Sequence, residues 1–309
     1  MNSKLPRGVY AAVLTPQRED LTIDTARFAA HCSWLLDNGC DGLAIMGTTG
    51  EANSFTVGER IAALDGIVEA GVLPDKLMVG TGCCAIPDTV ELTRHALGVG
   101  AGGVLMLPPF YYKQPDDEGV FRAFARTIET VNDDRLCVIL YHFPKMTGVP
   151  FSDSVVERLI GAYPEVVAGM KDSSGDWEHM ERLCRQFPDF RMYAGTEKYL
   201  LNILKIGGAG CISASTNLTC PQAGLVYRQW LSGGIADAEN TQAGLTELRS
   251  TLEKYPFVSG LKHAMATLSG DGGWRNMRPP NVPLDTERAE AVTDALAALG
   301  FPVGITRQT

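Results

Sequence analysis

The sequence predicts a closed (β/α)8 barrel, the TIM-barrel architecture, followed by a helical region. Short apolar runs of strand length alternate with helical patterns eight times between residues 9 and 213, without a break in the rhythm. Such alternation gives a parallel sheet covered by helices, and eight units with no reversal favour closure into a barrel. An open doubly wound sheet is the alternative. Such sheets usually carry a glycine-rich phosphate loop after the first strand, whereas this chain continues with Leu14-Thr15-Pro16-Gln17.

Each predicted strand is a short apolar run that ends at a turn residue or a polar side chain. The run 166–171 consists of small and apolar residues without polar alternation, which suits a strand buried on both faces. It ends in Lys171. The predicted strands cover residues 9–14, 43–46, 77–80, 103–107, 137–141, 166–171, 191–194 and 210–213.

Helices between these strands are indicated by capping residues and by apolar side chains at helical spacing. Asp24, Thr56 and Ser152 are predicted N-caps, and Asn38-Gly39 is a predicted stop. The acidic run Asp116-Asp117-Glu118 is typical of a first helical turn. The predicted helices cover residues 24–38, 56–70, 87–97, 116–128, 152–162, 177–187 and 197–206.

After Thr216 the strand patterns stop and helical patterns continue to the end of the chain. We therefore expect a barrel over residues 1–218 and a helical region over residues 219–309, packed on the barrel. Residues 275–283 hold three prolines, which predicts an extended connection. The additional helices are predicted at 221–232, 235–253, 257–268 and 286–299.

Composition limits the possible partners. The chain is 45% hydrophobic and 20% charged over 309 residues, which is ordinary for a globular protein with a core of its own. The formal net charge of −9 argues against nucleic acid and anionic membranes as partners. No apolar run reaches the roughly 18–20 residues that span a bilayer.

The eight cysteines form no compact framework, and the N-terminus has no secretory pattern. This favours reduced thiols and a cytoplasmic location. The pair Cys83-Cys84 lacks the C-x-x-C spacing of redox and zinc sites, so we expect it to pack in the core.

Polar side chains gather where the strands end, which is where such barrels carry their active sites. The candidates are the turn Gly47-Thr48-Thr49-Gly50-Glu51, the pair Tyr111-Tyr112, Tyr141 and Lys171. Each has a structural alternative, such as a tight turn, a subunit contact, a core aromatic or a solvated strand end. A lysine shielded from water is nevertheless suited to Schiff-base chemistry, because burial disfavours the ammonium form of an amine.

His142 follows Tyr141 directly, so it should point to the other face of its strand and have a structural role. The five histidines show neither H-x-H nor H-E-x-x-H spacing. We therefore predict no metal site, and no cofactor.

Taken together, the strand-end motifs resemble those of the dihydrodipicolinate synthase / N-acetylneuraminate lyase family of class I pyruvate aldolases. The resemblance extends from Gly8 to about Pro280. Its carriers are Gly47-Thr48-Thr49-Gly50-Glu51, Pro109-Phe110-Tyr111-Tyr112, residues 141–148, Gly169-Met170-Lys171-Asp172 and residues 207–213.

The resemblance implies roles for these residues. Lys171 would form an imine with the keto group of a 2-oxo acid, and Tyr141 would relay protons. Thr48 would link Tyr141 to Tyr112 of a neighbouring subunit in a homotetramer built as a dimer of dimers. The substrate carboxylate would be held by Thr48 and Thr49 in the turn that begins at Gly47, and the carbonyl of Ile212 would lie nearby.

The chain departs from two branches of the family. Where the synthase branch has an arginine for its aldehyde substrate, this chain has Met146, with Lys145 beside it as a point charge only. The neuraminate lyase branch has a threonine two residues after its lysine and a serine where Ala214 stands. The run Lys171-Asp172-Ser173-Ser174-Gly175-Asp176 looks more like members acting on 4-hydroxy-2-oxoglutarate or 2-keto-3-deoxy sugar acids.

In those members Ser173, Gly195 and Glu197 would contact the distal part of the substrate, although Ser173 and Ser174 could also be simple helix caps. The leading hypothesis is a Schiff-base lyase that cleaves an aldol to release pyruvate or dehydrates a 2-keto-3-deoxy acid. The alternatives are 4-hydroxy-tetrahydrodipicolinate synthase activity and a non-catalytic protein that binds 2-oxo acids.

Overall fold

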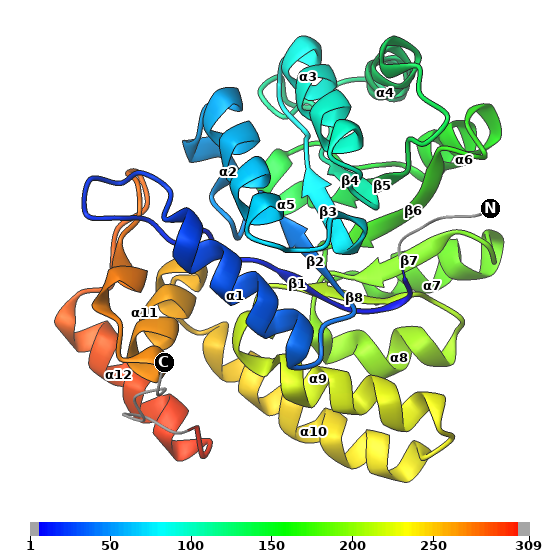
Figure 1. The fold of residues 1–309 in the computed structure, drawn as a ribbon. Coiled ribbons are helices and arrows are strands. Elements are labelled where there is room, and N and C mark those ends of the chain that lie inside the picture. Colours follow the sequence, from blue (N-terminus) through cyan, green and yellow to red (C-terminus); the bar gives the residue numbers. More distant parts are fainter. Residues whose placement is uncertain (1–5, 302–309) are drawn as a thin grey trace.

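Eight parallel strands close into a barrel in the computed structural model, which describes residues 6–301 (Figure 1). The predicted fold class is therefore confirmed. Closure comes from β1 and β8, which pair in parallel with Val9 opposite Cys211. The strands are β1 Gly8–Ala12, β2 Gly42–Ile45, β3 Leu77–Gly80, β4 Gly103–Met106, β5 Val138–His142, β6 Val167–Asp172, β7 Arg191–Ala194 and β8 Gly210–Ser213.

Helices surround the barrel, and the predicted caps form as local hydrogen bonds. The side chain of Asp24 accepts from the N–H of Arg27, and Thr56 forms a capping box with Glu59. The covering helices are α1 Thr25–Asp37, α2 Val57–Glu69, α3 Ile86–Gly98, α4 Asp117–Val131, α6 Asp153–Ala162, α7 Trp177–Gln186, α8 Leu200–Lys205 and α9 Thr216–Leu231.

Strand alternation divides the core into two layers. In β1, Val9 and Ala11 face the surrounding helices, whereas Tyr10 and Ala12 belong to the cluster that fills the barrel. This is the two-residue period of a strand that is buried on both faces. The same period places Lys171 and Asp172 on opposite faces of β6.

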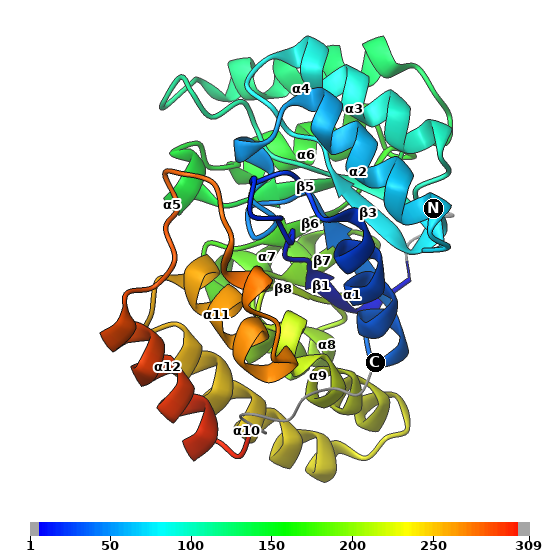
Figure 2. The same cartoon turned by 60° about the vertical axis from the view of Figure 1, so that its left-hand side comes forward.

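The C-terminal helices pack below one side of the barrel, and the connection between α11 and α12 rises toward its mouth (Figure 2). The helices are α10 Ile235–Leu252, α11 Phe257–Ser269 and α12 Thr286–Ala298. The expected boundary after residue 218 falls inside α9, which starts at Thr216 and continues through Pro221. Proline at 221 suggests a helix start from the sequence, but the chain is already helical there.

Three local details differ from the sequence-based expectations. A four-residue helix, α5 Pro144–Thr147, follows β5. The helix predicted over 197–206 is a 3-10 turn, Glu197–Tyr199, followed by α8. Cys84 is exposed and Cys83 is half-buried, because the pair lies in the loop after β3 rather than in the core. None of the helices within residues 6–301 is both long and apolar enough to cross a membrane.

Candidate active site

A cavity of about 460 Å³ opens at the C-terminal ends of the strands. Its deep part contains Thr48, Thr49, Tyr141 and Lys171, which come from the ends of β2, β5 and β6. The sequence motifs that follow these strands therefore meet in one place. Parallel strands bring this about, because all their carboxyl ends lie at the same face of the barrel.

Lys171 is buried in the wall of this cavity. The residue is 4% exposed, and its Nζ lies 4.2 Å from the centre of the Tyr141 ring. Tyr141 and Lys171 are direct neighbours in the register of β5 and β6. Among residues 6–301, no carboxylate lies within ion-pair distance of the Lys171 amine. The amine thus meets an aromatic face and open cavity rather than a counter-ion.

The phenol of Tyr141 points to the turn after β2. Its O–H donates to Oγ1 of Thr48 at 3.4 Å, which is a long but direct hydrogen bond. Phe143 stacks on the Tyr141 ring with a centroid distance of 5.8 Å. Gly47 borders a small adjoining void together with Thr48 and Tyr141. These contacts fix the ring on which a proton relay would depend.

The turn that carries Thr48 and Thr49 has an unusual backbone. Met46 and Glu51, on either side of it, both have positive φ, at 52° and 55°. Non-glycine residues in this region cost of order 1 kcal/mol each or more, and they persist only where their surroundings hold them. A Cβ on Gly50 would lie 3.0 Å from the carbonyl oxygen of Val13, so the turn is pressed against the end of β1.

The distal part of the cavity contains three of the predicted substrate contacts, Lys145, Ser173 and Gly195. Gly195 donates its N–H to the carbonyl of Asp172 at 2.6 Å. A Cβ at this position would come within 2.3 Å of the Ser173 hydroxyl oxygen, so only glycine allows this approach. Lys145 is exposed on α5 and has no ion pair with any of the described residues.

Three other candidates lie elsewhere. Glu197 is completely buried and accepts hydrogen bonds from Ser213 and Ser215, with Arg249 at 3.7 Å. It does not line the cavity, which contradicts the expected substrate contact at Glu197. Ile212 also lies outside the cavity lining, within the apolar filling of the barrel.

Tyr112 is 79% exposed and stacks edge-to-face with Tyr111, at a centroid distance of 5.4 Å. It is not among the residues that line the cavity of its own chain. An exposed aromatic pair beside the barrel mouth is what a tyrosine that acts across a subunit contact would look like in a single chain.

The C-terminal helices contribute residues that we did not predict. Arg249 of α10, Phe257 of α11 and Asn281 in the connection to α12 all line the cavity. Nothing in the local sequence marks them, because their approach to the strand ends depends on how the helical region packs.

Behind β6, on the face opposite Lys171, three titratable groups form a buried cluster: His142, Asp172 and His179. The two imidazoles stack at 4.7 Å, and His179 Nδ1 lies 2.6 Å from Asp172 Oδ2. Burial lowers the pKa of His142 to about 4, although Asp172 opposes this shift. Burial alone would raise the pKa of Asp172, but hydrogen bonds from His179 and Ser174 hold it below its usual value.

One ligand atom from each member of this cluster lies within 4.8 Å of the others, but the hydrogen bond that His142 accepts argues against a metal. His142 Nδ1 accepts from the N–H of Phe151 at 3.1 Å. A neutral imidazole that accepts at Nδ1 carries its proton at Nε2 and cannot ligate there. The cluster is better explained as the anchor of the chain after Lys171, in agreement with the structural role predicted for His142.

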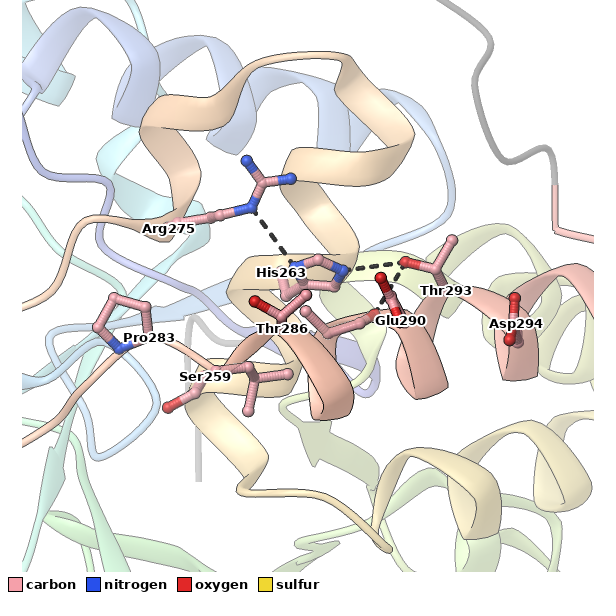
Figure 3. A pocket seen from close by; sticks show the side chains of 10 residues that line it. Ser259, His263, Arg275, Pro283, Thr286, Glu290, Thr293 and Asp294 are labelled. Atoms are coloured by element: carbon pink, nitrogen blue, oxygen red, sulfur yellow. Dashed lines mark hydrogen bonds between the residues drawn. The ribbon is translucent and has the colours of Figure 1, made fainter.

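A second hollow, of about 360 Å³, lies between α11 and α12 (Figure 3). At its centre, His263 contacts Thr293 at 3.0 Å and Arg275 at 3.4 Å. Ser259 borders both hollows. No lysine or tyrosine is among the described residues that line the second hollow, so it lacks the side chains that the sequence analysis expects for Schiff-base chemistry.

A family model and several known proteins match this chain over nearly its whole length. The model of the "Dihydrodipicolinate synthetase family" matches residues 5–299. An "Uncharacterized DapA-like lyase" of Chloroflexus aurantiacus is 35% identical over 291 residues, covering 94% of this chain and 96% of that protein. The 4-hydroxy-tetrahydrodipicolinate synthase of Gluconacetobacter diazotrophicus is 30% identical over 306 residues, covering 97% and 99% of the two chains.

Among solved structures, YagE of E. coli K12 is similar along the whole fold. It is described as a prophage protein of the dihydrodipicolinic acid synthase family in complex with pyruvate. Its TM-score is 0.87 at 28% identity, with 96% of this chain and 99% of that chain covered.

Proposed function

The chain belongs to the dihydrodipicolinate synthetase family of class I lyases, and from this premise we propose that it acts on 2-oxo acids through a Schiff base on Lys171. The observation that carries the proposal is the Lys171 amine itself. It is buried at the barrel mouth without a carboxylate partner among residues 6–301, and it lies over a tyrosine whose hydroxyl reaches Thr48. The pyruvate complex of the related YagE supports a 2-oxo acid as ligand.

The chemistry follows from the electron demand of an iminium. The Lys171 amine attacks the keto carbon, and the carbinolamine loses water to give the iminium. If the substrate is a 4-hydroxy-2-oxo acid, loss of the proton from its C4 hydroxyl breaks the C3–C4 bond, and the electrons flow into the iminium. The products are an aldehyde and the enamine of pyruvate, which is protonated at C3 and hydrolysed.

Dehydration begins from the same iminium. Loss of a C3 proton gives an enamine, which expels the C4 hydroxyl as water. In both routes Tyr141 would carry protons between substrate and Thr48, a role that is typically worth about 10²–10⁴ in rate. Thr48 and Thr49 would hold the substrate carboxylate next to the amine.

Borohydride trapping with pyruvate, followed by peptide mapping, tests this proposal. The expected result is a reduced adduct on Lys171. Lys262, which is also deeply buried, is a matched internal control, because its amine is paired with Glu51 and it is not among the residues that line this cavity. Failure to find an adduct on Lys171 would rule out the mechanism.

Lys145, Ser173 and Gly195 would contact the part of the substrate that lies farthest from the keto group. We propose that Lys145 binds an anionic group there, since it lines the cavity without an ion pair among the described residues. Lys145→Met should then raise KM about tenfold for 2-oxo acids with a second carboxylate, equivalent to ~1.4 kcal/mol, and leave KM for neutral analogues unchanged. Equal effects on both classes would contradict this assignment.

4-Hydroxy-tetrahydrodipicolinate synthase activity is the second candidate, because relatives about 30% identical carry that name. The residue Met146, at the position of the synthase arginine, argues against it. Turnover of pyruvate with aspartate semialdehyde would establish the synthase activity despite Met146. Pyruvate binding without turnover on any aldehyde or sugar acid would instead favour a non-catalytic binding protein.

Tyr112 would complete the site of a neighbouring subunit, within a tetramer of tight dimers. Its exposure in the single chain supports this. Chains carrying Lys171→Ala and chains carrying Tyr112→Phe should both be inactive alone and should regain activity when mixed into hybrids. Inactive hybrids would show that the tyrosine does not act across the subunit contact.

A further inference from the structure

A buried polar network joins the C-terminal helices to the turn after β2. Lys262 of α11 forms an ion pair with Glu51, and both side chains are inaccessible to solvent. Gln17 donates to Oε1 of Glu51 at 3.2 Å, and Asn281 donates to Oε2 at 3.4 Å. The Lys262 ammonium also donates to the carbonyl of Asn276 at 2.7 Å. The side chains that hold the Glu51 carboxylate therefore all come from segments outside the turn that carries Glu51.

Glu51 is coupled through its backbone to the threonines of the site. Its N–H donates to the carbonyl of Thr48 at 3.1 Å, and the next N–H, of Ala52, donates to Gly47 at 3.1 Å. The positive φ of Glu51 is not a conformation that the chain adopts without support. The buried carboxylate provides that support, because it can be satisfied only where Lys262, Gln17 and Asn281 converge.

The charges of the pair cannot be separated without penalty. Burial lowers the pKa of Lys262, and the Glu51 carboxylate opposes this shift. A buried carboxylate that lost its lysine, or a buried ammonium that lost its carboxylate, would be left without compensation. Each would be expected to move toward water and to take its chain segment with it.

We propose that the Lys262–Glu51 ion pair positions the turn that binds the substrate carboxylate, so that α11 is a working part of the active site. This inference rests on the proposed function. Lys262 touches no substrate in this scheme. It is a positioning residue that acts through Glu51 on Thr48 and Thr49. Asn281 contributes both to the buried network and to the cavity wall, since it donates to Glu51 and also lines the cavity.

Saturable trapping of pyruvate on Lys171 tests the proposal, because it separates binding from chemistry. With Lys262→Met, the pyruvate concentration for half-maximal trapping should rise at least tenfold, while the limiting adduct yield on Lys171 remains. Glu51→Gln should shift the midpoint in the same direction. All measurements are made well below the Tm of each variant, so that only folded protein is compared.

Arg27→Met is the matched control. Arg27 of α1 pairs with Asp271 at 2.7 Å and also joins the barrel to the C-terminal region, but it does not touch the turn. It should lower the Tm without moving the pyruvate midpoint. If Arg27→Met and Lys262→Met move the midpoint equally, the ion pair is merely structural and the proposal is wrong.

The double variant Glu51→Gln/Lys262→Met sharpens the test. It leaves no unpaired buried charge, so its Tm should recover relative to either single variant. The pyruvate midpoint should stay raised, since the turn has lost its anchor. A midpoint that recovers together with the Tm would overturn the proposal. If the unmodified protein traps no pyruvate at all, the proposed function fails first, and the two failures are thereby distinguished.

Discussion

Lys171 and Lys262 are both almost completely buried, yet their surroundings prepare them for opposite roles. Lys171 is 4% exposed beside the Tyr141 ring and a cavity, whereas Lys262 is fully buried against the Glu51 carboxylate. Desolvation favours the neutral form of an amine, and a carboxylate at ion-pair distance opposes this. Burial alone therefore does not identify a nucleophile. The informative difference is whether an acid or an open cavity faces the amine.

The two lysines also differ in what their loss would leave behind. Removing the Lys171 amine leaves no charged partner, because none lies within ion-pair distance among residues 6–301. Removing the Lys262 amine leaves a buried carboxylate. Loss of the Lys171 amine should thus abolish activity without loss of stability. Loss of the Lys262 amine should lower stability and weaken pyruvate binding without removing the nucleophile.

The largest expected effect tests this contrast directly. Lys171→Met should lower kcat/KM by a factor on the order of 10⁴ or more, since the covalent intermediate can no longer form. It should not lower the free energy of unfolding, because methionine fills similar space and no ion pair is broken. Steady-state kinetics and denaturant unfolding measure both quantities. A destabilised but active variant would reverse the assignment of the two lysines.

Tyr141→Phe should have the next largest effect. It removes the hydroxyl that reaches Thr48, so kcat should fall about 10²–10⁴-fold, while borohydride still traps pyruvate on Lys171. Tyr193→Phe is the matched control. Tyr193 is also buried in the barrel, but its hydroxyl donates to the carbonyl of Pro6 at 3.1 Å rather than to the site. Equal losses in the two variants would argue against a relay.

The cluster behind Lys171 predicts a pH effect on stability. The pKa of His142 is lowered to about 4 by burial, against about 6.5 when unfolded. Below pH 6.5 the unfolded chain therefore binds a proton at this residue that the folded chain refuses, and stability falls until about pH 4. At about 1.4 kcal/mol per pKa unit, this amounts to about 3 kcal/mol.

His142→Gln should flatten that part of the stability curve and keep an acceptor for the N–H of Phe151. Urea unfolding at several pH values between 4 and 7 measures the slope. Asp172, His179, Asp153 and Asp176 face the same residue and remain in both proteins. An unchanged slope would show that His142 titrates normally.

The smallest effect comes from an ion pair that is only partly buried. Glu59 pairs with Arg278 of the connection before α12, with side chains 34% and 22% exposed. The hydrogen bond from Arg278 lowers the pKa of Glu59 to about 2, so any stabilisation is present above pH 4.5 and lost as the pH falls toward 2.

Because solvent screens this pair, Glu59→Gln should lower the free energy of unfolding by about 1 kcal/mol or less. Glutamine can retain the capping box with Thr56, so the change isolates the charge. Lys262→Met should instead cost about 3–5 kcal/mol, the range for an uncompensated buried charge. Similar losses of unfolding free energy in the two variants would mean that burial does not determine how strongly an ion pair stabilises this protein.

Much of the architecture could be predicted because its signals are local. Asp24, Thr56 and Ser152 cap their helices through their own first turns, as predicted. The helix start at Thr216 was missed because Pro221 gave a competing local signal. The short helix α5 was missed because four residues leave no periodicity to detect.

The sequence predicted those site residues that stand directly at strand ends, because the direction of a strand determines which end of the barrel they reach. Lys171, Tyr141 and Thr48 lie at strand ends, and parallel strands must bring those ends together. Glu197 shows the limit. It also follows a strand, but Ser213 at the end of β8, Ser215 after it and Arg249 of α10 hold its carboxylate away from the cavity.

The sequence by itself thus determined the barrel, its order and the chemistry at the strand ends, because periodicity, caps and strand direction act over a few residues. The tertiary structure alone decided which buried lysine meets a carboxylate and which meets a cavity. It also decided that Asn281 and Arg249 reach the barrel mouth. Those outcomes depend on contacts between segments far apart in the chain, and no local pattern encodes them.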